Sequence, residues 1–590
     1  MAVSPLAAIV DQSIANERQL VMSRVSDMAR VGGLVRRASP ALAIAAVLSS
    51  VGVAVVVPAI AYTSLRMFDA ILVAHSEAET IRWMSIEIGL AVTVTVFTCL
   101  QQDTSRLLRE PLALEMSTAL ARTAAAMPLT DLESPATRDQ LSQARVTAGT
   151  RAGQLVEDML TVLQVVVSLA ICALVISRYT GLAILTVVAV IPGVIVEVWS
   201  ARALHRASER LSHDQQRFDL LEETILSGPC SVENKFLDAG RPLSGRLRAI
   251  GDRLGAEQLR VWRRAGLPAA IAQLLPTVAY YGVQLYLGLQ AARGTLSFGA
   301  FTMCLIVMYN VQYYLQQALV AGRSASETWI HLRGYFELID GPARPPALPP
   351  ARVGAPRLAT GAAPLGLRLR DVGFRYPGSE AWALRHVDLD VAPGEVVGIV
   401  GGNGSGKSTL VRILTGLYRP GEGTITLDGR DLSEWDEAAL RARFAVTFQD
   451  FARYRMSLRE NLVLPPADGD DELRLAEAFA ASGVDQLLPD LPRGLDTALS
   501  ASFGAGVELS GGQWQKVALA RAFARREADH LILDEPTSAL DARSEERVLE
   551  HVAARRRKQT IVLITHRLSA LRSADRVVLL EKGRASVARA

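Results

Sequence analysis

The chain is poor in cysteine, in histidine and in net charge. Its 590 residues include four cysteines and eight histidines, and no two cysteines have the spacing of a zinc or thiol redox site. The formal net charge is +3 with 21% charged residues, so the sequence has no basic field that would attract nucleic acid. We therefore expect neither a zinc or redox centre nor a nucleic-acid partner.

Apolar residues, by contrast, are abundant and clustered. Half of the residues are hydrophobic, and six long apolar runs occupy the first half of the chain, each close to the ~20 residues that span a bilayer as a helix. The sequence therefore predicts an all-α, six-helix transmembrane domain with the lipid bilayer as its partner. The six predicted spans are Ala41–Leu65, Trp83–Leu100, Met159–Ser177, Gly181–Trp199, Leu267–Leu289 and Phe298–Val320.

The arginines predict how these spans are oriented. Residues 1–40, 103–155 and 201–266 are each rich in arginine, whereas the other three loops hold only Arg66, Arg82, Arg178 and Arg293. Positively charged loops stay on the cytoplasmic side, so we expect both termini and both long segments in the cytosol, with the protein in the cytoplasmic (inner) membrane. The first 40 residues lack the apolar core and cleavage site of a secretory signal and are expected to be a cytosolic lead-in.

The two long cytosolic segments keep a helical apolar period and are each interrupted once. The interruptions are at Pro128–Pro135 and Ser227–Ser231. We expect each segment to extend two membrane helices into the cytosol as a hairpin, with a short crosswise helix at its tip. Such a tip can dock on the domain that follows.

The composition changes after residue 340. Residues 341–364 are rich in Pro, Ala, Gly and Arg and have no period, which is typical of a linker. From residue 365 onward, short β-rich runs alternate with helical ones, as in an α/β domain with a mostly parallel sheet. We therefore assign residues 1–340 to the transmembrane domain, 341–364 to a linker and 365–590 to an α/β domain.

A phosphate-binding loop opens this second domain. The run G-G-N-G-S-G-K-S follows a predicted strand, Val397–Val400, and precedes a predicted helix, Ser408–Leu417, which is the context that the P-loop motif requires. Glycine backbone N–H groups and the helix N-terminus surround phosphates, the lysine neutralises them, and the serine binds Mg²⁺. The predicted nucleotide-binding residues are Gly401, Gly402, Asn403, Gly404, Ser405, Gly406, Lys407, Ser408 and Thr409.

Two acids end a second apolar strand. Leu531–Leu533 is followed by Asp534 and Glu535. Asp534 suits the Mg²⁺ shell, and Glu535 is placed to polarise an attacking water. In isolation such a pair is also compatible with an ordinary solvated turn, but beside a P-loop the catalytic interpretation is favoured.

These motifs, with L-S-G-G-Q at Leu509–Gln513, identify the resemblance. The chain resembles an ATP-binding cassette (ABC) transporter of the exporter type, in which one transmembrane domain precedes one P-loop ATPase domain. The resemblance implies ATP and Mg²⁺ as ligands. It also implies that Tyr376 stacks on adenine, although a tyrosine at a strand end can equally be structural.

The resemblance assigns further roles residue by residue. Gln449 would contact Mg²⁺ or the attacking water, and His566 would hydrogen-bond the γ-phosphate as a catalytic residue beside Glu535. The signature residues would meet the ATP held by a partner domain, and Asp541 closes a loop, Ser538–Asp541, that spans the dimer seam. The signature residues are Ser510, Gly511, Gly512 and Gln513.

Each nucleotide site then needs two chains, so we expect a homodimer or a dimer with a related half-transporter. The predicted function is ATP-driven export of an organic or peptide cargo of unknown identity. Two strings, Gln449–Asn461 and Glu508–Arg521, resemble exporters of lanthipeptides. The alternatives are a multidrug or lipid exporter, an importer with exporter architecture, and a regulatory membrane ATPase. A soluble ABC protein acting on DNA or ribosomes would lack the apolar runs.

Polar residues inside the predicted spans are candidates for the cargo path. Glu87 is a carboxylate about one turn into the second span, where it either serves function or snorkels to the interface. Asn310, Tyr314 and Gln317 share one helix face, as do Tyr280, Tyr281 and Gln284. These faces either line a cavity or hydrogen-bond neighbouring helices.

Overall fold

The computed structural model describes residues 29–176, 211, 214–226, 228–272, 274–341, 366–464, 472–502, 504 and 506–588. The chain divides into two compact units. One consists of Met1–Ala125 and Asp139–Gly341, and the other of Ala126–Arg138 and Pro342–Ala590. The first unit is helical, and the second is an α/β domain that includes a short segment from the helical half of the sequence.

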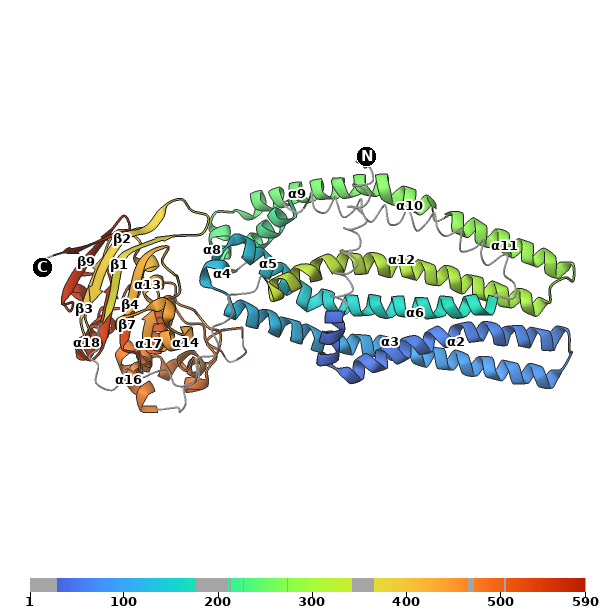
Figure 1. Cartoon of the computed structure of the whole chain (residues 1–590), viewed down its shortest axis with the longest axis horizontal. Coiled ribbons are helices and arrows are strands. Elements are labelled where there is room, and N and C mark those ends of the chain that lie inside the picture. The colour runs from blue at the N-terminus through green and yellow to red at the C-terminus, as the bar shows by residue number, and fades with distance from the viewer. Residues whose placement is uncertain are drawn as a thin grey trace, which may run out of the picture. The chain divides into compact units, whose positions relative to one another are not determined.

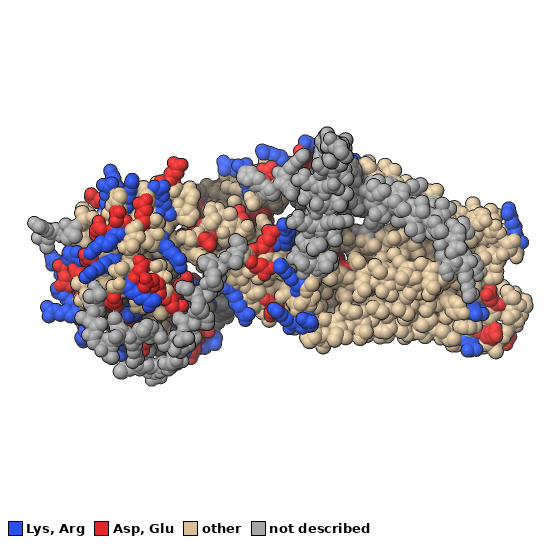
Figure 2. All heavy atoms as spheres, viewed as in Figure 1, with Lys and Arg blue, Asp and Glu red and all other residues tan. Residues whose placement is uncertain are grey.

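Among the described residues of the first unit, four helices are long and apolar enough to cross a membrane. Ser39 and Ser297 begin two of them by accepting hydrogen bonds from backbone N–H groups of their first turns. In Figure 2 the middle of this unit shows almost only uncharged residues, and charged side chains gather toward its ends. The four helices are α2 (Pro40–Leu72), α3 (Glu77–Ala126), α6 (Ala152–Ile176) and α12 (Phe298–Asp340), shown in Figure 1.

These helices contain four of the six predicted spans, except that Ser177, the last residue of one span, lies outside the described residues. The run Gly181–Trp199 lies outside the described residues. The run Leu267–Leu289 is helical, as α10 (Leu267–Ala272) and α11 (Leu274–Ala292), but is not among the four candidate spans. A buried apolar cluster joins α2, α6, α11 and α12, with Ala61, Cys172, Val283 and Cys304 among its members.

The first of the two hairpins predicted to be cytosolic has the expected short helix at its tip. Helix α3 ends at Ala126, α4 (Leu129–Glu133) follows, and α5 (Pro135–Val146) leads through a π-helical turn at Thr147–Arg151 into α6. The loss of the backbone N–H at proline explains the boundaries, because Pro128 precedes α4 and Pro135 begins α5.

The second predicted interruption, Ser227–Ser231, is described only from Gly228 onward. Residues 228–231 are already helical, as the start of α8 (Gly228–Phe236). The chain turns at residues 237–239, where Asp238 has φ +47°, and α9 (Gly240–Val261) follows. Pro229 lies in the first turn of α8, a position that tolerates proline.

The α/β domain has two sheets. A four-stranded antiparallel sheet has the order β2-β1-β4-β5, and a six-stranded sheet has the order β10-β9-β3-β8-β7-β6 with parallel pairing from β9 to β6. All side chains of β7 and β8 are buried, as expected for strands covered on both faces. The strands are β1 (Leu367–Arg375), β2 (Trp382–Val391), β3 (Val396–Val400), β4 (Glu422–Leu427), β5 (Arg430–Asp431), β6 (Phe444–Thr447), β7 (His530–Asp534), β8 (Thr560–Ile564), β9 (Arg576–Glu581) and β10 (Arg584–Ala588).

Helices complete this domain around the sheets (Figure 1). The largest apolar cluster contains side chains of α16, α17 and α18 together with those of the central strands, including Phe479, Val517 and Val548. The helices are α13 (Lys407–Leu414), α14 (Glu437–Ala442), α15 (Leu458–Leu462), α16 (Glu472–Ser482), α17 (Gly511–Phe523), α18 (Ala542–Arg555) and α19 (Leu568–Leu571).

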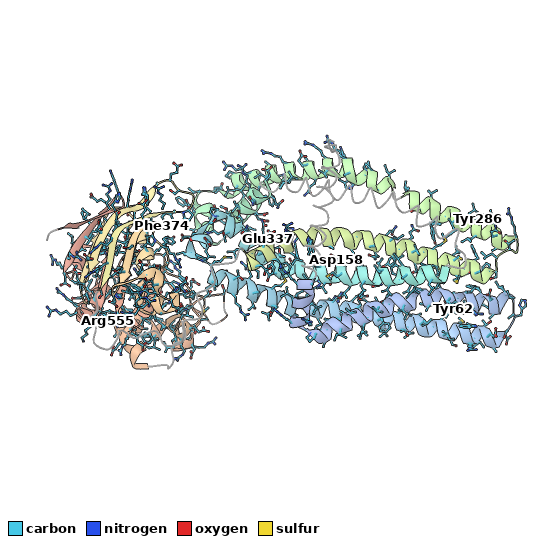
Figure 3. The ribbon with its side chains drawn as sticks, viewed as in Figure 1. Tyr62, Asp158, Tyr286, Glu337, Phe374 and Arg555 are labelled. Atoms are coloured by element: carbon cyan, nitrogen blue, oxygen red, sulfur yellow. The ribbon has the colours of Figure 1, made fainter. Side chains whose placement is uncertain are left out.

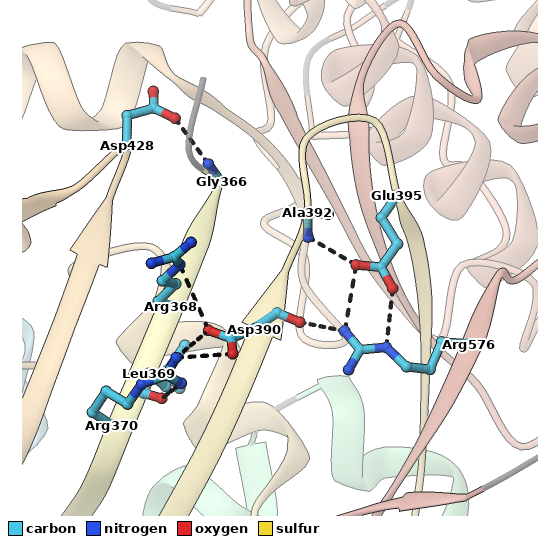
Figure 4. A network of polar contacts seen from close by, with 9 residues as sticks. All are labelled: Gly366, Arg368, Leu369, Arg370, Asp390, Ala392, Glu395, Asp428 and Arg576. Carbon is cyan, nitrogen blue, oxygen red and sulfur yellow. Dashed lines mark hydrogen bonds and ion pairs between the residues drawn. The ribbon is translucent and has the colours of Figure 1, made fainter. Parts of the chain in front are cut away.

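An ion-pair network ties the two sheets together (Figure 4). Arg576 on β9 pairs with Glu395 at 2.9 Å and also donates to the backbone carbonyl of Asp390 on β2. The Asp390 carboxylate pairs in turn with Arg370 on β1 at 2.8 Å. Because exposed pairs of this kind contribute about 0–1 kcal/mol each, the network sets register more than it adds stability.

His530 gives the α/β domain a predictable pH dependence. Its ring is 5% exposed and lies 5.1 Å from that of Phe444, and burial lowers the pKa of His530 to about 4. A buried neutral histidine contributes stability above its unfolded pKa of 6.5, and that stability is lost as pH falls from 6.5 toward 4. Between pH 7.5 and pH 5 the loss from this group is about 2 kcal/mol.

Hydrogen exchange of the β7 amides, corrected for intrinsic rates, measures this loss. The variant His530→Phe should lose about 30-fold less protection than the native chain on going from pH 7.5 to pH 5. An equal loss of protection in both proteins would contradict the assignment.

Candidate functional site

The predicted catalytic residues gather at one edge of the parallel sheet. Strands β3, β8, β7 and β6 are neighbours and parallel, so their carboxyl ends meet at this edge. The phosphate loop follows β3, and His566 follows β8. Asp534 ends β7 with Glu535 next, and Gln449 lies two residues beyond β6. Parallel topology alone therefore brings these side chains close together, as it does in other open α/β sheets that bind ligands at this position.

The backbone of the phosphate loop requires glycine. Gly404 and Gly406 have φ of +73° and +103°. A Cβ on Gly401 would lie 2.3 Å from the carbonyl oxygen of Leu580, and one on Gly406 would lie 2.7 Å from that of Ala383. The hydroxyl of Ser405 is buried and has no hydrogen-bond partner among the described residues. The loop is thus a tight concavity with a polar group still to be satisfied, which suits an anion.

Lys407 closes this loop from the other side. Its Nζ donates to the carbonyl oxygens of Gly401 at 2.8 Å and Gly402 at 3.0 Å, which keeps the ammonium over the concavity. Helix α13 begins at the same residue and ends at Leu414, three residues before the predicted end. The helix stops early because Gly416 adopts φ +71°, a left-handed conformation that ends helices.

The two acids after β7 have different environments. Asp534 is buried and accepts a hydrogen bond from Ser408, and burial together with the neighbouring charge of Glu535 raises the pKa of Asp534 to about 6. Glu535 has φ +49°, and its backbone N–H donates to Ile564 at 2.9 Å. Its carboxylate lies 3.6 Å from Nδ1 of His566, whose side chain is exposed. A cation bound near Ser408 would favour the charged form of Asp534.

Gln449 and Tyr376 lie next to this edge. Gln449 is exposed, just past the end of β6. The hydroxyl of Tyr376 is 2.8 Å from that of Thr409 in α13, and its ring meets Phe374 and Tyr418 edge to face. The structure therefore fixes Tyr376 beside the phosphate-loop helix, and its adenine-stacking role stays a prediction.

The signature residues form the N-terminus of helix α17. Ser510 caps α17, and Gln513 accepts in return from the backbone N–H of Ser510 at 2.8 Å, a capping box. Asp541 caps α18 in a similar way by accepting from Ser544, and these hydrogen bonds lower the pKa of Asp541 to about 2. Within the described part of the chain, no hydrogen bond or ion pair joins Leu509–Gln513 to the phosphate loop.

Gln515 is a site residue that the sequence analysis missed. It is 2% exposed, and its Nε2 donates to the carbonyl oxygen of Glu535 at 3.0 Å and to Ser538 at 3.2 Å. Its Oε1 accepts from the backbone N–H of Ala539 at 2.9 Å. One buried amide thus ties the signature helix to Glu535 and to the loop Ser538–Asp541. Its only sequence signal was its position two residues after the signature.

The polar side chains that were predicted to share faces in the membrane spans do not all lie on the predicted faces. Asn310 and Tyr314 are buried, and Tyr314 hydrogen-bonds Ser168 and Gln164 of α6, so this face connects helices. Tyr280 is buried whereas Tyr281 is exposed, so these two do not share a face. These contacts favour the alternative of helix–helix hydrogen bonding for Tyr314.

Glu87 has one partner in the described chain. Its Oε1 accepts from the hydroxyl of Ser64 on α2 at 2.9 Å, and its Oε2 is buried without a hydrogen bond there. The carboxylate therefore joins α3 to α2 and does not extend freely to the interface.

Comparisons with known proteins agree with this geometry. The family profile described as ABC transporter matches residues 384–538, a range that holds the phosphate loop, Gln449, the signature and Glu535. The chain is 33% identical over 444 residues to an ATP-dependent lipid A-core flippase of Cupriavidus metallidurans, an alignment that covers 73% of this chain and 69% of the flippase.

Other relatives align over shorter stretches. An ATP-dependent lipid A-core flippase of Alkalilimnicola ehrlichii is 38% identical over 280 residues, 47% of this chain and 43% of its own length, so the chain spans less than half of that relative. The nisin transport ATP-binding protein NisT of Lactococcus lactis subsp. lactis is 38% identical over 218 residues, 37% of this chain and 36% of its own length.

A solved structure shows the same fold. A bacterial Atm1-family ABC exporter with ATP bound superimposes with a TM-score of 0.74 at 22% identity, over 94% of this chain and 96% of that one. The helical membrane domain followed by an α/β ATPase domain is thus confirmed as the fold.

Gln515 should affect turnover more than nucleotide affinity. The variant Gln515→Ala removes the three hydrogen bonds that position Glu535 and the following loop, and small displacements at a catalytic group cost about 10- to 100-fold in rate. We expect kcat for ATP hydrolysis by the purified protein to fall by that factor while KM changes less than about threefold. Arg543→Ala, an exposed change on the neighbouring α18, is the control. A normal kcat in Gln515→Ala would refute the positioning role.

Proposed function

Because the chain belongs to the ATP-binding cassette (ABC) transporters of the exporter type, we propose that it hydrolyses ATP to export an amphipathic organic molecule across the cytoplasmic membrane. The observation that carries this proposal is the edge of the parallel sheet. There the glycine-rich loop, Lys407, Ser408, Asp534 and Glu535 lie beside one another in a chain that also contains membrane-spanning helices.

The loop fits a nucleotide's phosphates. It presents backbone N–H groups and the start of α13, it has no room for a side chain at Gly401 or Gly406, and the hydroxyl of Ser405 is buried without a partner among the described residues. The hard oxygen donors of Ser408, Asp534 and Gln449 suit Mg²⁺. Mg²⁺, when bound, neutralises phosphate charge during transfer.

The chain's own residues then have separate tasks. Lys407 is already held over the loop by two carbonyl oxygens and can exchange them for phosphate oxygens. Glu535 accepts hydrogen bonds from the attacking water and orients it. His566 lies 3.6 Å from Glu535 and can bridge that carboxylate to the γ-phosphate. Gln515 holds the backbone of Glu535 in place.

A second copy of the chain would complete each site. The signature residues cap α17 away from the phosphate loop in the described chain, so their free N–H groups are available to ATP held by a partner. We propose a homodimer with two equivalent sites, with a related half-transporter as the alternative partner. Both termini and both ATPase domains lie on the cytosolic side in this proposal.

The first cytosolic hairpin supplies the link to the membrane helices. Its tip, Ala126–Arg138, belongs to the same compact unit as the ATPase domain. The carboxylate of Glu133 accepts from the Tyr418 hydroxyl and lies 3.4 Å from Arg412. The ring of Tyr418 stacks on Phe374 at 4.8 Å and touches Tyr376 edge to face. Movement at the nucleotide site can therefore reach the hairpin through three aromatic rings.

The comparisons favour a lipid- or drug-like cargo over a peptide. The relative aligned over most of its length is named as a lipid A-core flippase, whereas the lantibiotic transporter aligns over about a third of its own length. The similarity of the strings near the signature to lanthipeptide exporters lies in the ATPase domain, which does not contact cargo. Of the organic and peptide cargoes first expected, we therefore prefer an organic one, as in the multidrug or lipid alternative.

Removal of the water-orienting group is the direct test of this function. The variant Glu535→Gln should retain ATP and lower turnover by about 100-fold or more, because the amide cannot accept the water's proton. Trapped nucleotide and phosphate release, measured on reconstituted protein, report the two effects. Normal hydrolysis by the variant would show that Glu535 has no such role.

The contact at the hairpin tip should couple hydrolysis to transport. Glu133→Ala removes the partner of Tyr418 and Arg412, and we expect basal ATP hydrolysis within about twofold of normal but a loss of most cargo-stimulated hydrolysis. Thr130→Ala, on the same short helix, is the matched control. Full stimulation in Glu133→Ala would mean that this contact does not transmit the signal.

A further inference from the structure

A hydrogen-bonding face of α12 is exposed in the middle of its membrane span. Tyr309 and Tyr313 are one helical turn apart and are 62% and 45% exposed. They lie 11 and 15 residues from the start of α12 at Phe298, or roughly 16 and 22 Å along the helix axis, within a hydrocarbon core about 30 Å thick. Polar groups at that depth are costly when they face acyl chains, so this face is expected to meet something other than lipid.

The hydrogen bonds on this face leave groups free to bind a ligand. Gln317 donates from Nε2 to the Tyr313 hydroxyl at 2.8 Å, which holds the phenol in place. The Tyr313 proton and the Gln317 carbonyl oxygen have no partner among the described residues, and neither does the Tyr309 hydroxyl. Two donors and one acceptor are therefore available at mid-membrane depth, and the Tyr313–Gln317 hydrogen bond holds two of the three side chains in place.

The same pairing of tyrosine and glutamine occurs twice on α11. Gln284 hydrogen-bonds Tyr280, and Gln290 donates to the Tyr286 hydroxyl at 3.0 Å. Figure 3 places Tyr286 near the end of α11 that leads to α12, where an interfacial aromatic is ordinary. The α12 pair lies deeper than the Tyr286 pair, so the two give a matched comparison between a central and an interfacial position.

The lack of charged residues in the membrane segments of α11 and α12 limits which head groups this face can bind. Neither Phe298–Gly322 nor Leu274–Ala292 contains an Asp, Glu, Lys or Arg residue. An anionic or cationic head group bound here would therefore be desolvated without a counter-charge from either of these two segments, which is unfavourable. A neutral head group with hydroxyl or amide groups leaves water at little cost in free energy. Phenol and amide groups replace its hydrogen bonds to water, and tyrosine rings cover its apolar surface.

We propose that Tyr309, Tyr313 and Gln317 form the recognition surface for the cargo's head group, and that this head group is uncharged and carries hydroxyl or amide groups. The proposal rests on the export function proposed above. It predicts selectivity by head-group charge, with neutral hydrogen-bonding amphiphiles preferred over charged ones that have the same tail.

Three amphiphiles with one tail test this selectivity. Dodecyl maltoside, dodecyl phosphate and dodecyltrimethylammonium, each below its micelle concentration, are added to the full-length protein in nanodiscs while ATP hydrolysis is measured. We expect the maltoside to stimulate hydrolysis at a concentration about tenfold or more below that of either charged compound. Tyr313→Phe with Gln317→Leu should raise the half-maximal maltoside concentration about tenfold, because two hydrogen bonds are lost with little change in volume.

The interfacial pair provides the control for these variants. Tyr286→Phe with Gln290→Leu makes the same chemical change on α11 and should leave the maltoside response within about twofold of normal. Equal responses to all three amphiphiles, or an unaltered response in the α12 double variant, would overturn the recognition surface but leave the export function standing. If none of the three amphiphiles stimulated hydrolysis by the native protein, that result would count against both the recognition surface and the export function.

A second copy of the chain is the other occupant to be tested. If Tyr309→Cys on two chains forms a disulfide under oxidation in the membrane, the face is an interface between copies, and the proposal fails. Labelling of that cysteine by a water-soluble maleimide, reduced by dodecyl maltoside, is the result that the proposal predicts.

Discussion

The parallel pairing of β3, β8, β7 and β6 is the constraint on which the catalytic arrangement depends. Four buried strands end at one edge, and each delivers a different group there: a phosphate-binding backbone, a histidine, two acids and a glutamine. The strands are held by apolar burial on both faces, so their ends cannot move independently. A change in the bound nucleotide is therefore expected to move the loops and helices that lead away from this edge, and not the strands themselves.

Two such routes are visible in the described residues. Gln515 connects Glu535 and the loop after it to the signature helix through a single buried amide. On the other side, Tyr376 connects the phosphate-loop helix to Tyr418 and so to Glu133 at the hairpin tip. The first route leads toward the surface that would meet a second chain, and the second toward the membrane helices. A transporter that couples nucleotide state to cargo movement needs both.

Much of this arrangement was predictable from the sequence, because its causes are local. The phosphate loop, the two acids and the apolar runs each have a pattern whose physical reason is confined to about 20 residues. The predicted end of α13 was three residues too late, because the left-handed backbone conformation of Gly416 ends the helix earlier. The face of Tyr314 could not be predicted, since its partners Ser168 and Gln164 come from a helix about 150 residues earlier. Gln515 was missed for the same reason: its role exists only through contacts with a distant loop.

The central claim is that ATP brings two copies of the ATPase domain together across shared sites. A spin label on Arg543→Cys, an exposed position close to the loop Ser538–Asp541, can report this when the four native cysteines are replaced by alanine. The distance between labels on two chains is measured by pulsed electron resonance in the Glu535→Gln protein with and without Mg²⁺ and ATP. The account predicts a broad, long distribution without nucleotide and a single shorter distance with it. An intermolecular distance that does not respond to ATP, or the absence of any such distance, would contradict it.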